Sequence, residues 1–182
     1  MPSAFAHAAV GATLATALPP AARPRLFLLV LAAAAAAPDL DVILHHTGVA
    51  YHHPLGHRGF THSILFAGLA GAASFPVWRR FGAQQPALAG TLTAAAVLSH
   101  GLLDMFTDAG LGIGLFIPFE NGRYFAPFRP LMTSPLSVAA FFQGRGLSIL
   151  ANEALWIGPP TLLLAAVATL VRKRLSEEHD RA

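Results

Sequence analysis

Five apolar segments constrain the fold of this chain more strongly than any other feature of its sequence. Apolar blocks of this length favour helices embedded in a bilayer over the core of a soluble domain. The charge supports this interpretation, because charged residues make up only 12% of the sequence, whereas soluble domains carry about 25%. The segments lie at about residues 3–18, 25–37, 61–78, 86–106 and 154–170.

We therefore expect an all-α, polytopic membrane helix bundle of about five segments that forms a single domain, residues 1–182. A complete span needs about 20 apolar residues, so the first two segments could cross a thinned bilayer or only dip into it. Pro38 should stop the second segment, and Gly158-Pro159-Pro160 should kink or delay the fifth. The first segment has no basic region before it and contains His7, so we interpret it as a retained helix rather than a signal peptide.

The basic residues predict the orientation of the chain in the membrane. In a five-span arrangement three basic groups fall on one side, which the positive-inside rule assigns to the cytoplasm. The amino terminus and the long connection at residues 107–152 then lie outside. No basic stripe is interleaved with exposed aromatic residues, which argues against a nucleic-acid partner. The basic groups are Arg23 with Arg25, Arg79 with Arg80, and Arg172-Lys173-Arg174.

The same arrangement brings a set of ionisable residues to the outer membrane face. Gly59 permits a tight turn before the third segment, and Thr61 is the expected N-cap, which places His62 in the first helical turn. Ionisable groups are expensive within membrane segments and usually mark a site. The residues that converge in this way are His7, Asp39, Asp41, His57, His62, His100, Asp104 and Glu153.

The spacing of His100 and Asp104 predicts a metal site. Residues at i and i+4 project from one helix face and can reach one cation, although this histidine could instead hydrogen-bond to the aspartate. Because the chain contains no cysteine, the ligands must be nitrogen and oxygen, a set that suits zinc and also manganese or iron. We expect one to three divalent ions, with zinc preferred. The expected ligands are His7, Asp41, His57, His62, His100 and Asp104.

Several neighbouring residues have more than one possible role. Asp39 or Asp41 could act as a general base, bridge two metals, orient a ligating histidine or merely cap a turn. Arg58 could hold a substrate phosphate through its paired donors, or lie at the lipid headgroups. Glu120 and Glu153 are further candidate ligands, whereas the remaining loop histidines are better explained as solvated residues. These are His45, His46, His52 and His53.

These motifs carry a resemblance to a known family. The chain resembles the YdjM family of bacterial inner-membrane proteins, which are described as membrane-bound, metal-dependent hydrolases. The resemblance covers most of the chain to about residue 130. A more distant likeness is to the zinc-dependent phospholipase C and P1 nuclease group, but no histidine lies between His100 and Glu153 to supply that group's later ligands. The matching elements are His7 with Gly11, PDLD at residues 38–41, HRGFTHS at 57–63, SHGLLD at 99–104, Thr107-Asp108 and Pro118-Phe119.

The resemblance implies a metal-dependent hydrolase in the bacterial inner membrane, and the orientation predicted above places its active site on the periplasmic side. From the site residues we expect a phosphoester or lipid substrate, with membrane lipids as partners. Asp39, Asp41 and Arg58 are the expected catalytic residues. A metal transporter is an alternative, but it would need polar residues through the inner halves of the third to fifth segments, which are alanine, leucine, glycine and phenylalanine. A second alternative is a non-enzymatic membrane protein in which the metal only stabilises the packing of the helices. The oligomeric state stays open.

Overall fold

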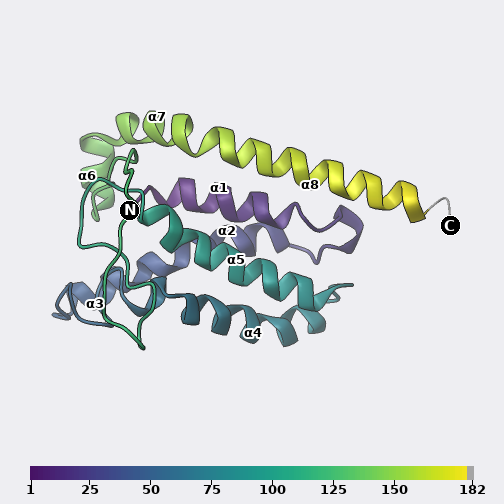
Figure 1. Ribbon diagram of the computed structural model, residues 1–182, viewed down its shortest axis with the longest axis horizontal. Coiled ribbons are helices and arrows are strands. Elements are labelled where there is room, and N and C mark those ends of the chain that lie inside the picture. Colours follow the sequence, from purple (N-terminus) through teal and green to yellow (C-terminus); the bar gives the residue numbers. More distant parts are fainter. Residues whose placement is uncertain (180–182) are drawn as a thin grey trace.

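The computed structural model describes residues 1–179 and confirms the all-α prediction. Four helices lie alongside one another as a bundle, with α1 against α2, α4 against α5, and α5 also against α1 and α2 (Figure 1). Each of them falls within one of the first four predicted segments or overlaps it closely. They are α1 (Ala4–Ala15), α2 (Phe27–Ala36), α4 (Ile64–Arg80) and α5 (Pro86–Asp104).

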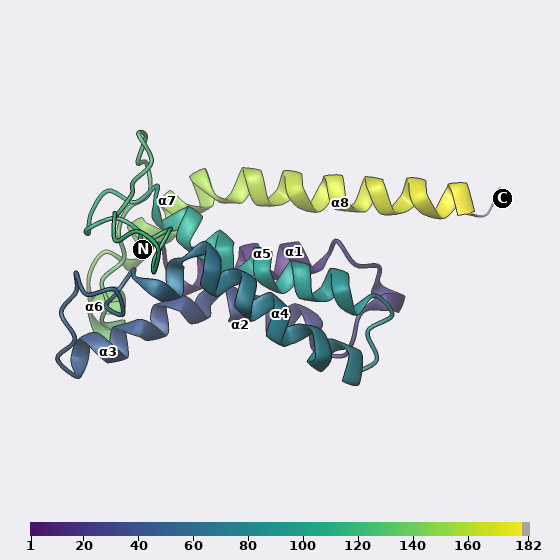
Figure 2. The ribbon, with the colours of Figure 1, turned by 60° about the horizontal axis from the view of Figure 1, so that its bottom comes forward.

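The other elements lie at the two ends of the bundle or along its side. The last helix, α8, packs on α1 and continues past the bundle, on the side away from α4 (Figure 2). Helix α8 meets the preceding helix, α7, at a bend of 43°, which confirms the kink predicted at Gly158-Pro159-Pro160. These elements are η1 (Pro20–Ala22), η2 (Ala37–Asp41), α3 (Val42–His46), η3 (Phe60–His62), α6 (Val138–Gln143), α7 (Gly146–Trp156) and α8 (Gly158–His179).

The second segment does not stop at Pro38, which corrects the sequence prediction. The α-helix ends at Ala36, but the chain continues through the 3₁₀ helix η2 into α3. Pro38 is tolerated because it lies in the first positions of η2, where its missing N–H is not needed. Phe27–His46 is consequently one apolar helical stretch of 20 residues. Asp39 and Asp41 therefore lie within a helical stretch and not beyond its end.

The entry into the third segment also differs from the prediction. The N-cap of α4 is Ser63, whose Oγ accepts a hydrogen bond from the Phe66 N–H at 3.1 Å. Thr61 lies earlier, in η3, and its hydroxyl donates to Asp41 instead, at 2.7 Å. His62 is therefore held in a turn before α4 and not in its first helical turn.

Two helical stretches of the described residues are long and apolar enough to cross a membrane, Phe27–His46 and Pro86–Asp104. The bent pair of α7 and α8 would make a third if it acts as one span. With 12 and 17 residues, α1 and α4 are shorter than a full span requires. All five predicted segments are helical, but the connection at residues 107–152 also contains α6 and most of α7. Neither of those two helices was predicted.

Apolar and small side chains fill the half of the bundle away from η2 and η3. A Cβ on Gly71 would lie only 2.7 Å from the Cβ of Ala94, so α4 and α5 approach closely there. Close approach of this kind is how helices associate within a bilayer, where lipid removes the hydrophobic drive. The buried core of this half consists of Ala15, Leu18, Phe27, Leu31, Ala35, Trp78, Ala89, Leu92 and Ala96.

Candidate metal centre

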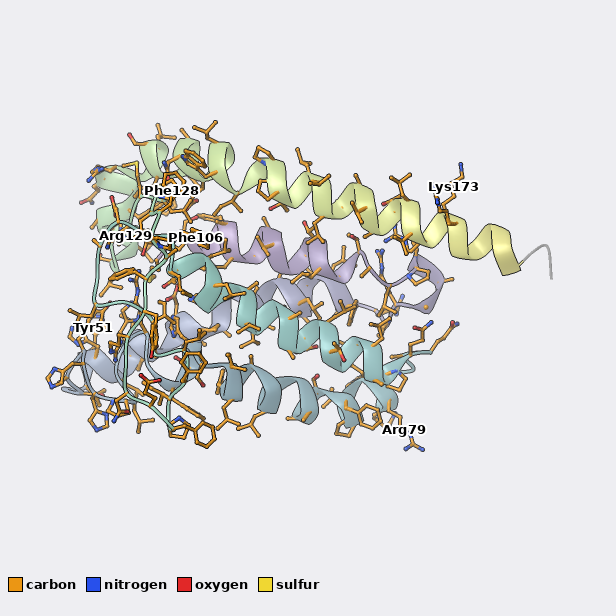
Figure 3. The ribbon with its side chains drawn as sticks, in the orientation of Figure 1. Tyr51, Arg79, Phe106, Phe128, Arg129 and Lys173 are labelled. Carbon is orange, nitrogen blue, oxygen red and sulfur yellow. The ribbon has the colours of Figure 1, made fainter. Side chains whose placement is uncertain are left out.

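Ionisable side chains gather at the end of the bundle where α1 begins and α5 ends. Figure 3 marks this end with Tyr51, and it marks the opposite end with Arg79. The Asp39 side chain is 12% exposed. Each of the other side chains of this cluster is no more than 4% exposed. Charged groups buried in this way require partners. The buried members are His7, Asp41, His57, Arg58, His62, His100 and Asp104.

His100 has the orientation of a metal ligand. Its Nδ1 lies 2.7 Å from the backbone oxygen of Ala35, which can only accept, so Nδ1 carries the hydrogen. The Nε2 atom of the neutral ring then presents a lone pair, and it lies 3.2 Å from Asp39 Oδ1. A histidine fixed through one ring nitrogen by a backbone carbonyl, with the other nitrogen free, is typical of metal sites.

Asp104 lies one turn further along α5, as predicted, and its two oxygens face different partners. Oδ1 is 3.4 Å from His7 Nε2, while Oδ2 is 3.1 Å from Arg58 Nε. Oδ2 also lies 3.9 Å from His62 Nε2. The His7 ring stacks on His100 with 3.7 Å between centroids. Histidines from α1, η3 and α5 therefore meet at the end of α5.

Asp41 organises the loop that carries His57 and His62. Its Oδ1 lies 2.6 Å from His57 Nδ1. Its Oδ2 accepts from the Arg58 N–H at 3.1 Å and from the Thr61 hydroxyl at 2.7 Å, and it lies 3.3 Å from His62 Nδ1. Because both oxygens are occupied, the geometry supports the orienting role among the alternatives considered for Asp41.

The buried atoms that face one another in this cluster have no hydrogen-bond partners. An unpartnered polar atom in a protein interior is costly, and carboxylate and imidazole atoms that converge on one point could hold a cation. One ligand atom from each of Asp39, His62, His100 and Asp104 lies within 4.8 Å of the others, and Asp39, Asp41 and His57 form a second such group. The unpartnered atoms are both nitrogens of His7, both carboxylate oxygens of Asp39 and of Asp104, Arg58 Nε, and the Nε2 atoms of His62 and His100. A nitrogen and oxygen set of this kind fits a divalent cation.

His62 shows how strongly the site favours positive charge. Burial lowers the pKa of this imidazole, but the carboxylates of Asp39 and Asp41 outweigh burial and raise the pKa to about 9. Without a cation, a proton on His62 supplies the charge that the carboxylates require. A bound cation would replace that proton.

Arg58 is enclosed by the protein, contrary to the expectation that it holds a substrate phosphate. The side chain is 1% exposed. Its Nη1 donates to the Ala109 oxygen at 2.9 Å and its Nη2 donates to the Thr107 hydroxyl at 3.1 Å, while Nε faces Asp104. All three guanidinium nitrogens thus face protein groups. Arg58 therefore balances the charge of Asp104, and its hydrogen bonds hold the loop after α5 in place.

The two glutamates considered as ligands lie outside both ligand groups. Glu120 is exposed and accepts a hydrogen bond from the Tyr124 hydroxyl at 2.5 Å. Glu153 is buried and accepts from the Ser3 hydroxyl at 2.7 Å and from the Ser3 N–H. This contact joins α7 to the start of α1, the helix that carries His7. The loop histidines also lie outside both groups: His45, His46, His52 and His53.

Sequence reasoning missed two residues that support the site. Thr107 receives the Arg58 guanidinium, and it was noted only as part of the family resemblance. Arg123 donates to the backbone oxygens of His57 and Tyr51, both at 3.1 Å, and so fixes the loop before η3. No local pattern marks Arg123, because its partners lie 66 and 72 positions away in the chain.

Comparison with known proteins identifies the family. The profile of the YdjM inner membrane protein family matches residues 1–176. The chain belongs to this family. It is also 32% identical to inner membrane protein YbcI of Escherichia coli (strain K12) over 164 residues, which cover 90% of this chain and 95% of that protein. No solved structure matches the chain. Family membership confirms the principal resemblance, whereas no match supports the likeness to the phospholipase C and P1 nuclease group.

Proposed function

We propose that this inner membrane protein is a divalent-metal-dependent hydrolase that cleaves a phosphoester or lipid ester at the membrane–water interface. The observation that carries the proposal is the convergence of buried, unpartnered histidine and aspartate atoms at one end of the bundle. The residues that would hold the first ion are Asp39, His62, His100 and Asp104, with His7 beside them.

The partial exposure of Asp39 favours hydrolysis, because a substrate must reach the metal ligands. A divalent ion supplies Lewis acidity and activates water for attack on an ester. Asp39 is the most exposed member of the cluster, at 12%, so we propose that substrate approaches beside it. Asp41 and the Ala35 carbonyl orient the histidines, and Arg58 balances the charge of Asp104.

We also propose that the site faces the periplasm. Arg79 and Lys173 lie at the end of the bundle opposite Tyr51 (Figure 3), as expected if that end is cytoplasmic. A reporter active only in the cytoplasm should then function when fused after residue 182, and one active only outside should function when inserted near Asn121. The reverse pattern would place the site on the cytoplasmic face.

A structural metal site is the second candidate, and the burial of the cluster favours it. The residues of the first ligand group come from η2, η3 and α5, so one ion would join three elements of the fold. A transporter has less support, because apolar residues of the core described above fill the bundle beyond the cluster.

Metal content and turnover measured together distinguish these functions. Protein purified in detergent should contain at least one equivalent of metal by elemental analysis. It should hydrolyse a member of a panel of phospholipids and phosphodiesters, and both chelation and Asp104→Ala should abolish this activity. If metal raises the melting temperature of the protein and no member of the panel is hydrolysed, this result would contradict the hydrolase and support the structural site.

A further inference from the structure

A cavity lies at the opposite end of the bundle from the metal centre, between the start of α2, the end of α4 and the first half of α5. Its volume is about 420 Å³, within the range of roughly 300–1,000 Å³ of small-molecule sites. The Trp78 side chain, 4% exposed, forms part of its wall. The lining residues are Arg25, Leu26, Val30, Ser74, Val77, Trp78, Phe81 and Thr93.

The interior of this cavity offers an apolar surface to a ligand, because its polar groups already have partners. The Thr93 hydroxyl accepts from Trp78 Nε1 at 3.0 Å and donates to the Ala89 oxygen at 2.9 Å. The Ser74 hydroxyl donates to the Gly71 oxygen at 2.7 Å. A ligand that fills the cavity therefore meets no free hydrogen-bond donor from these three side chains, and a hydrocarbon chain is the group that fits.

The mouth of the cavity carries positive charge. Arg25 is exposed there, and it forms no hydrogen bond or ion pair with any part of the chain that the structure describes. Arg23 differs, because it donates to the Leu18 oxygen at 2.7 Å. Leu26 begins α2 in the left-handed conformation, with φ of 64°, and no side chain caps the helix. The uncapped amino end of α2 adds positive potential beside Arg25.

We propose that this cavity binds an anionic phospholipid, with one acyl chain against Trp78 and the phosphate beside Arg25. The apolar interior, the cationic mouth and the membrane location of the family all match this ligand. The site is separate from the metal centre, so it does not depend on the hydrolase proposal.

Fluorescence quenching tests this site directly. The chain contains two tryptophans, so Trp156→Phe leaves Trp78 as the single reporter. The variant is placed in phosphatidylcholine vesicles that contain a small fraction of lipid brominated on its acyl chains. Brominated phosphatidylglycerol should quench Trp78 more strongly than brominated phosphatidylcholine at the same fraction. Arg25→Gln should reduce this preference about fivefold, the contribution of one arginine near anionic lipid.

Two further variants separate the cavity from general surface charge. Arg79→Gln removes the same charge from the same end, but Arg79 does not line the cavity, so the preference should be nearly unchanged. Val77→Phe should fill the cavity and reduce quenching by both lipids. Equal quenching of the Trp156→Phe protein by the two lipids would overturn the proposal. Equal losses from Arg25→Gln and Arg79→Gln would also overturn it, because attraction would then belong to the whole surface.

Discussion

The two ends of the helix bundle are held together by different forces. Near Trp78, helices α2, α4 and α5 meet through alanine, leucine and aromatic side chains, and the buried hydroxyl of Thr93 is fully hydrogen-bonded. Near Asp104, the same helix α5 presents a buried histidine and a buried aspartate whose facing atoms have no hydrogen-bond partners. One end is therefore complete as a protein interior, whereas the other presents ligand atoms that could hold a cation. This difference predicts that removing charge or metal will disturb only one end.

Matched substitutions on α5 should give the largest contrast between the two ends. Asp104→Ala leaves Arg58 and its histidine neighbours without their carboxylate, and breaking a buried pair in this way costs about 3–5 kcal/mol. Thr93→Ala leaves only the Trp78 N–H without its acceptor, which costs about 1–3 kcal/mol. Thermal unfolding in detergent measures both variants, and elemental analysis should find metal only in Thr93→Ala. Retention of metal by Asp104→Ala would remove the distinction between the ends.

Asp41→Asn should have a smaller effect that is confined to the metal end. If Asp41 orients His57 and His62 without ligating the metal, the variant should bind the same number of ions about 10- to 100-fold more weakly. Competition with a metal-sensitive dye gives the affinity, and saturation with metal gives the number of sites. A lost equivalent at saturation would show that Asp41 is itself a ligand.

Acidification should weaken metal binding gradually. Burial lowers the pKa of His62, but Asp39 and Asp41 raise it to about 9, so the metal-free protein carries this proton at neutral pH. Metal binding displaces the proton, and the apparent affinity should therefore rise about tenfold per pH unit until roughly pH 9. Metal titrations between pH 6 and pH 9 measure this slope. An affinity independent of pH would mean that His62 does not exchange a proton for metal.

The sequence predicted best those features of the structure that depend on local patterns of residues. Apolar segments predicted the helices, and the i and i+4 spacing placed His100 and Asp104 on one face of α5. The path through Pro38 was not predicted, because the 3₁₀ helix that accommodates this proline depends on how η2 packs. The role of Arg58 was also inaccessible, since its partners Thr107 and Ala109 lie 49 and 51 positions further along the chain. The residues that neighbour an arginine in sequence do not show whether its side chain is buried or exposed.

Metal analysis of the double variant His100→Ala/Asp104→Ala tests the central claim most directly. Both residues lie on α5 and contribute unpartnered atoms to the same ligand group. We expect the wild-type protein, purified in detergent without added chelator, to contain at least one equivalent of a divalent metal. The double variant should lose most of it while α-helical circular dichroism is retained, because the apolar half of the bundle does not depend on the cation. Equal metal content in the two proteins, or none in the wild type after incubation with zinc, manganese or iron, would contradict a metal centre at this position.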